Sequence, residues 1–113
     1  MDRSVVYKIL NVADWEHAVA AGVSATALDS KDGYVHLSTA HQVGETLALH
    51  YGAQAGLHLL EFAVEDLGDV RWEPSRGGEL FPHLYGALQI EKAKRKWVLD
   101  LGSDNVPSLP VDL

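Results

Sequence analysis

The chain contains no cysteine, and this absence limits what a protein of 113 residues can fold into. Disulfide cross-links, thiolate metal centres and a cysteine nucleophile are all excluded. Stability must therefore come from an apolar core, which a domain of about 110 residues can build. Hydrophobic residues make up 47% of the chain, which is typical of a globular domain. The length has room for one domain, so we assign residues 1–113 to a single domain.

The charge balance limits the class of partner. The chain carries 9 basic and 16 acidic residues, a formal net charge of −7. Nucleic-acid duplexes and anionic membranes favour clustered lysine and arginine, so the balance argues against both. The basic run Lys92, Lys94, Arg95 and Lys96 is interpreted as a solvated edge strand. No apolar stretch approaches the roughly 18 residues of a membrane helix, and the first ten residues do not resemble a signal peptide, so we expect a cytoplasmic protein.

Hydrophobic periodicity predicts an α+β domain with short, largely antiparallel strands. Strands are expected at residues 5–10, 34–38, 57–64, 83–88 and 93–101. Helices are expected at residues 13–21, ended by Gly22, and from the capping box of Thr39 and Gln42 to about residue 51. The connections 23–33 and 65–82 are expected to be irregular, apart from a short strand around 71–72. The tail from about residue 102 is expected to be irregular as well.

The strand at residues 34–38 carries the first candidate site. Alternation places Val35 and Leu37 on one face, which we assign to the core, and Tyr34, His36 and Ser38 on the other. A row of hydrogen-bonding groups on one rigid strand would hold a ligand precisely. A half-solvated strand with a surface histidine explains the same pattern.

The segment 72–86 carries the second candidate site. If its end is extended, Phe81, His83 and Tyr85 project from one side. Glu73 and Glu79 are candidates for accepting a proton or stabilising developing positive charge. So many polar and aromatic groups within fifteen residues indicate a functional loop.

The middle of the same segment is suited to an anion. Gly77 and Gly78 permit backbone conformations in which N–H groups face a phosphate, and Arg76 offers a planar fork for it. Trp72 and Ser75 stand beside them in the sequence. A surface loop in which the glycines make a turn and Arg76 pairs with a nearby glutamate is the alternative interpretation.

Other common chemistries have weaker support. The sequence lacks a Walker loop, a G-x-G-x-x-G fingerprint and the G-x-S-x-G elbow of serine hydrolases. Its six histidines do not follow zinc-ligand spacing, so we expect no metal site, and a metal-dependent hydrolase ranks last among the hypotheses.

The segments 32–38 (DGYVHLS) and 72–86 (WEPSRGGELFPHLYG) together resemble the bacterial domain-of-unknown-function 952 family. The resemblance runs from about residue 7 to about residue 101. The fold of this family is similar to that of ADP-ribosyltransferases. The resemblance therefore implies a split arrangement of two small, mainly antiparallel sheets, with two short helices and a central cleft.

The resemblance also implies roles for individual residues. In ADP-ribosyltransferases a strand histidine binds a ribose hydroxyl of NAD, a tyrosine stacks on nicotinamide, and a glutamate stabilises an oxocarbenium-like transition state. His36 matches the histidine by position, and Tyr51 or Tyr85 matches the stacking ring. The glutamate is not matched, because the late-strand position holds His83 or Tyr85.

These observations predict a cleft that binds a small phosphorylated ligand such as NAD or ADP-ribose, with NAD as a candidate substrate and no certain cofactor. Transfer or hydrolysis at a ribosyl bond is the enzymatic interpretation. A non-catalytic metabolite- or peptide-binding module using the same cleft is the alternative. The catalytic candidates are His36, Glu73, Glu79 and His83. The ligand-binding candidates are Tyr34, Ser38, Tyr51, Trp72, Ser75, Arg76, Gly77, Gly78, Phe81 and Tyr85.

Overall fold

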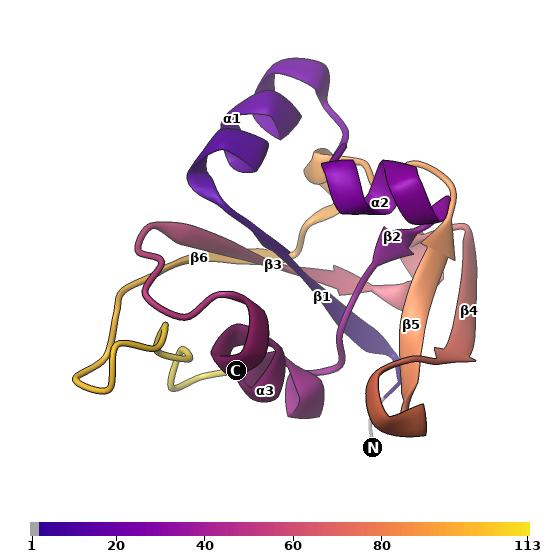
Figure 1. Ribbon diagram of the computed structural model, residues 1–113. Coiled ribbons are helices and arrows are strands. Elements are labelled where there is room, and N and C mark those ends of the chain that lie inside the picture. The colour runs from indigo at the N-terminus through magenta and orange to yellow at the C-terminus, as the bar shows by residue number, and fades with distance from the viewer. Residues whose placement is uncertain (1–2) are drawn as a thin grey trace.

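A computed structural model describes residues 3–113 apart from the side chain of Arg76 (Figure 1). The strands and helices follow one another as β1 (Val5–Leu10), α1 (Val12–Ala21), α2 (Ala27–Asp32), β2 (Val35–His36), α3 (Ala40–His50), β3 (Leu57–Ala63), β4 (Asp69–Pro74), β5 (Leu80–Tyr85) and β6 (Arg95–Leu99). Single turns of 3₁₀ helix lie at Val64–Asp66, Arg76–Gly78 and Ile90–Lys92.

The strands form two three-stranded antiparallel sheets, which confirms an α+β fold with two small antiparallel sheets. The first has the order β1-β3-β6 and the second the order β2-β5-β4. An isolated bridge joins them, because the backbones of Tyr7 and Ser38 exchange hydrogen bonds of 2.7 and 3.0 Å. The chain thus leaves the second sheet at His36 and reaches β1 of the first sheet two residues later.

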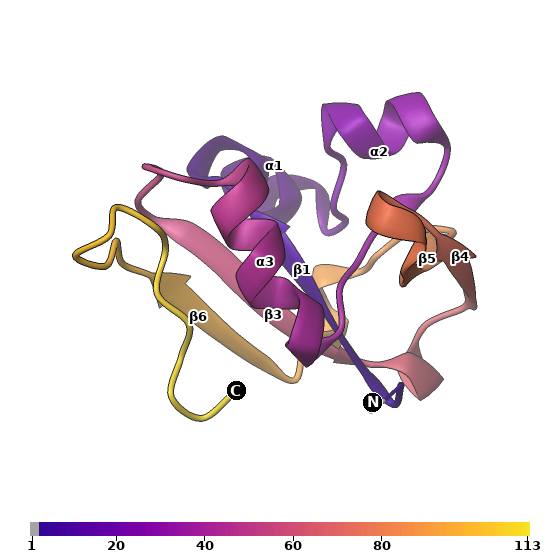
Figure 2. The same ribbon diagram turned by 60° about the horizontal axis from the view of Figure 1, so that its bottom comes forward.

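The first sheet is covered on both faces. On one side α3 lies across it (Figure 2), with Val43 and Leu47 packed against Tyr7, Ile9 and Leu59. On the other side the first sheet packs against α1 and the second sheet. Those core side chains are Val6, Leu10, Ala18, Val35, Leu37, Leu60, Phe62, Leu84 and Leu88. Burial of these apolar surfaces supplies the stability that disulfides do not.

The helix signals in the sequence are confirmed for α1 and α3. The Asn11 side chain caps α1, and Gly22 ends it in the left-handed conformation with φ 80°. At α3 the Thr39 side chain accepts from the Gln42 N–H, and the Gln42 side chain accepts from the Thr39 N–H. This reciprocal pair satisfies two backbone donors that the helix leaves free.

The prediction of two helices and an irregular segment 23–33 is wrong, because α2 lies within that segment. The Thr26 side chain caps it by accepting from the Asp29 N–H, and Gly33 ends it with φ 84°. A helix of six residues is too short to show an apolar period. Its two caps were the signal available in the sequence.

The irregular segment 65–82 and the strand 83–88 are also corrected. β4 spans six residues there, because Val70 and Trp72 alternate with polar residues and pack against the core. β5 begins three residues earlier than predicted and contains Pro82, which favours the end of a strand. Pro82 is tolerated because β2 has already ended opposite it, and only the Pro82 carbonyl bonds there, to the Leu37 N–H at 3.1 Å.

The remaining strand predictions differ mainly at their ends. The prediction 34–38 reduces to the two residues of β2, and 93–101 reduces to Arg95–Leu99. β6 is an edge strand, as the basic run predicted. Among the described residues, no helix combines the length and apolar character that crossing a membrane requires.

Candidate functional site

A cleft of about 530 Å³ lies beside the end of β1, between α2 and the C-terminal end of α3. Its volume falls in the range of small-molecule sites. Six of the predicted site residues line it: His36, Ser38, Tyr51, Ser75, Phe81 and His83. Segments that are remote in the sequence therefore contribute together to the lining of this cleft.

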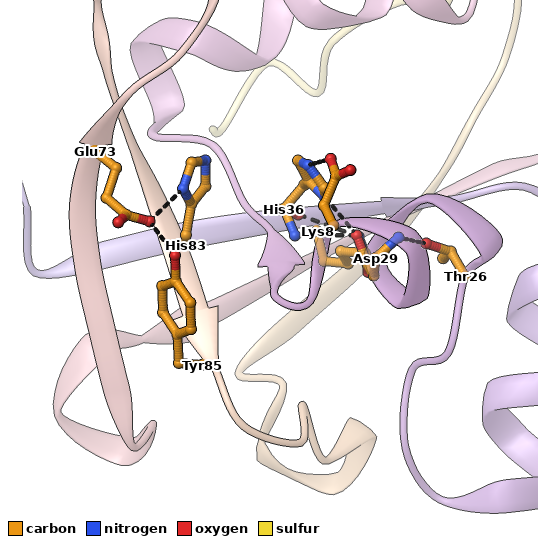
Figure 3. A network of polar contacts seen from close by, with 8 residues as sticks. Lys8, Thr26, Asp29, His36, Glu73, His83 and Tyr85 are labelled. Carbon is orange, nitrogen blue, oxygen red and sulfur yellow. Dashed lines mark hydrogen bonds and ion pairs between the residues drawn. The ribbon is translucent and has the colours of Figure 1, made fainter.

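A buried carboxylate in the cleft wall belongs to Asp29 on α2, which is 7% exposed. It accepts from the Lys8 ammonium at 2.8 Å and from the His36 backbone N–H at 3.1 Å, and it contacts the His36 ring Nδ1 at 2.6 Å (Figure 3). Lys8 Nζ also donates to the His36 carbonyl at 3.1 Å. One carboxylate therefore ties β1, α2 and β2 together.

The contact between Asp29 and Lys8 affects the pKa values of both side chains. Burial alone would raise the pKa of Asp29, but hydrogen bonds from His36 and the charge of Lys8 outweigh it and lower that pKa to about 2. Burial lowers the pKa of the Lys8 ammonium, and Asp29 opposes that change. Asp29 is thus an ionised anchor at any physiological pH.

His36 has carboxylates at both ring nitrogens. Its Nε2 lies 3.0 Å from Asp32 Oδ2, opposite the Nδ1 contact with Asp29. The two partners differ in exposure, with 7% for the Asp29 side chain and 33% for that of Asp32. The Nδ1 contact is therefore enclosed, while the Nε2 contact lies at the solvent-facing side.

A second imidazole–carboxylate pair stands next to the first. His83, 3% exposed, contacts the Glu73 carboxylate through Nδ1 at 2.9 Å, and the Tyr85 hydroxyl donates to the same oxygen at 2.6 Å (Figure 3). These hydrogen bonds from Tyr85 and His83 lower the pKa of Glu73. The Tyr34 ring stacks on His83 at 4.1 Å, and the His36 and His83 rings lie 5.6 Å apart.

Several predicted site residues stand outside the cleft lining. Trp72 packs against the core, with the Arg3 guanidinium over its ring. Glu79 accepts from the Gln42 side chain at 3.1 Å. Tyr34, Glu73, Tyr85, Gly77 and Gly78 do not line the cleft either, although the two glycines have the positive φ values that the sequence suggested. The side chain of Arg76 lies outside the described part of the structure.

Sequence reasoning missed most of the other lining residues. Lys8, Thr26, Leu28 and Asp29 line the cleft, as does the exposed His50. Lys8 was detectable as a lone charge in an otherwise apolar strand. Asp29 was hidden because its segment showed no pattern.

The expectation of no metal site came from the spacing of the histidines in the sequence. The structure shows how these side chains and the carboxylates are arranged in space. Within residues 3–113, no group of three or more histidine, aspartate or glutamate side chains is arranged to hold a metal ion. The two imidazole–carboxylate pairs instead form separate networks, one between α2 and β2 and the other between β4 and β5.

Comparison with known proteins identifies relatives. The chain is similar to protein CC0527 from Caulobacter crescentus. Its crystal structure is 46% identical, covers 93% of this chain and 94% of that chain, and has a TM-score of 0.87. The solution NMR structure of CC0527 is 45% identical over 97% of each chain, with a TM-score of 0.84. No curated protein matches the sequence. Residues 9–95 match the model of the family described as protein of unknown function (DUF952), so the chain belongs to that family.

Proposed function

We propose that the cleft binds a small phosphorylated nucleoside ligand of the NAD or ADP-ribose class. The observation that supports this most is the shared cleft lining. His36 and Ser38 come from the first sequence motif, and Ser75, Phe81 and His83 come from the second. Imidazole and hydroxyl groups suit ribose hydroxyls, and aromatic rings suit a planar base. The resemblance to ADP-ribosyltransferases implies the same ligand class.

The phosphates would be bound near the turn 75–78. Ser75 lines the cleft, and Gly77 and Gly78 follow it with φ values of 68° and 78°. The Gly78 N–H closes this turn by donating to the Ser75 carbonyl at 2.9 Å, so the Gly77 N–H is the backbone donor proposed for the phosphate. Arg76 lies between Ser75 and Gly77 in the sequence. It is the proposed cationic partner of the phosphate, because a guanidinium can bind phosphate through two parallel hydrogen bonds.

The positions of the carboxylates support a binding function better than a transferase activity. A ribosyl transferase needs a carboxylate next to the sugar, but neither of the predicted glutamates, Glu73 and Glu79, lines the cleft. The carboxylates that line it are Asp14 and Asp29, and Asp29 is already held by Lys8 and His36. Glu73 already accepts from His83 and Tyr85. The proposal is therefore a binding module first.

Hydrolysis of the ribosyl–nicotinamide bond is the second candidate, and the His83–Glu73 contact favours it. Glu73 holds Nδ1 at 2.9 Å, which leaves Nε2 as the nitrogen able to take a proton from water. In that reaction water bonds to the ribose carbon, its proton passes to His83, and nicotinamide leaves as a neutral molecule.

Calorimetric titration with ADP-ribose, NAD, AMP and nicotinamide tests the proposal. We expect ADP-ribose to bind and His36→Ala to weaken it about tenfold or more, the loss of one ligand hydrogen bond. His41→Ala is the matched control, because His41 is exposed and lies outside the cleft lining. Binding to none of these compounds would refute the nucleotide site. An assay of nicotinamide release from NAD distinguishes hydrolysis from binding alone.

A further inference from the structure

The two carboxylates at His36 have unequal surroundings. Asp29 is enclosed and holds Lys8 and the His36 backbone as well as the ring. Asp32 is not part of the cleft lining but adjoins it through His36, its hydrogen-bond partner, and is 33% exposed. Replacing the Asp32 contact would cost one solvent-facing interaction. Replacing the Asp29 contact would also leave the buried Lys8 ammonium without its anion.

Lys8 holds the Asp29 carboxylate in place. Its side chain comes from the middle of β1, lines the cleft and is only 6% exposed. An ammonium in that position requires an anion, so Asp29 cannot turn away to follow a ligand. The same carboxylate then fixes the His36 ring by contacts to both its Nδ1 and its backbone N–H.

The Tyr34 ring lies beside the His36 ring and restricts its position. Its centroid lies 4.7 Å from that of His36 and 4.1 Å from that of His83. With Nδ1 held by Asp29 and Tyr34 beside the ring, Nε2 is the ring atom whose partner can be exchanged.

We propose that Asp29 positions His36 and that Asp32 occupies, in the free protein, the place at His36 Nε2 that a ligand hydroxyl takes on binding. The inference rests on the proposed function and names the ligand group, a ribose hydroxyl. Asp32 is thus an internal competitor, and Asp29 is a positioning residue that acts through His36. Removing the two carboxylates must change ADP-ribose affinity in opposite directions.

Calorimetric titration of ADP-ribose into variants tests the exchange at Nε2. Asp32→Ala is expected to bind ADP-ribose about threefold or more tightly than Asp100→Ala. Asp100 is exposed and outside the cleft lining, and its removal changes the net charge equally, so it controls for weaker repulsion of an anionic ligand. Equal affinities in these two variants, or weaker binding by Asp32→Ala, would overturn the exchange.

The positioning by Asp29 is tested in a variant that keeps the core neutral. The double variant Lys8→Met, Asp29→Asn removes both buried charges and is expected to bind ADP-ribose about tenfold or more weakly. Unchanged affinity would overturn the role of Asp29.

NMR of the free protein adds a readout that simple destabilisation does not produce. A protected His36 Nδ1 proton is expected in the wild type and in Asp32→Ala, and it is expected to be lost in the double variant. Its presence in all three would overturn the positioning. If wild-type protein binds no nucleotide, the proposed function and the exchange both fail, and the Nδ1 signal still decides the part played by Asp29.

Discussion

Asp29→Asn is expected to lower the free energy of unfolding by about 3–5 kcal/mol, the usual cost of leaving one member of a buried ion pair without its partner. The Lys8 side chain is 6% exposed and 2.8 Å from the carboxylate that this change neutralises. The variant also weakens the two contacts of His36 with Asp29. Chemical unfolding at neutral pH, followed by tryptophan fluorescence, measures the difference.

Removing both charges provides the control. In Lys8→Met, Asp29→Asn no unpaired ion is buried, so most of the lost stability is expected to return. Asp32→Ala is expected to cost about 1 kcal/mol or less, because its contact with His36 is partly exposed. A double variant as unstable as Asp29→Asn alone would show that the ion pair does not account for the loss.

The same carboxylate makes the protein sensitive to acid. Its pKa falls from an ordinary 3.8 to about 2 in the folded state, so the folded protein binds this proton less readily than the unfolded chain. The resulting stability is complete above pH 3.8 and is lost as the pH falls through about 2. A shift of this size corresponds to about 2 kcal/mol.

Unfolding free energies of the wild type and of Lys8→Met, Asp29→Asn between about pH 5 and about pH 2 isolate this contribution. Other carboxylates titrate in both proteins and cancel in the comparison. We expect the advantage of the wild type to shrink by about 2 kcal/mol over that range. A constant difference would mean that the Asp29 pKa is not lowered by folding.

Local signals in the sequence were sufficient for several elements. β1 has the predicted bounds, β3 differs from its prediction by one residue, and the capping box at Thr39 is present. These features depend on neighbouring residues, which is why patterns of a few positions predict them. The motif strand also placed Val35 and Leu37 in the core.

The features missed by the sequence depend on contacts between remote segments. α2 has too few residues for a helical period, and its buried face is defined by the contact of Asp29 with Lys8, 21 positions earlier. The position of Pro82 inside β5 depends on where β2 ends. The cleft was predicted from the resemblance, but two thirds of its lining residues, Asp29 among them, required the fold.

The most direct measurement of the central claim is an NMR titration of the ¹⁵N-labelled protein with ADP-ribose. If the cleft is the nucleotide site, chemical-shift changes will concentrate in α2, at residues 36–38 and 50–51, and at Ser75, all of which border it. The exposed edge strand β6, which contributes no residue to the cleft lining, will stay unchanged. Changes centred on β6, or no changes at saturating ADP-ribose, would contradict the account.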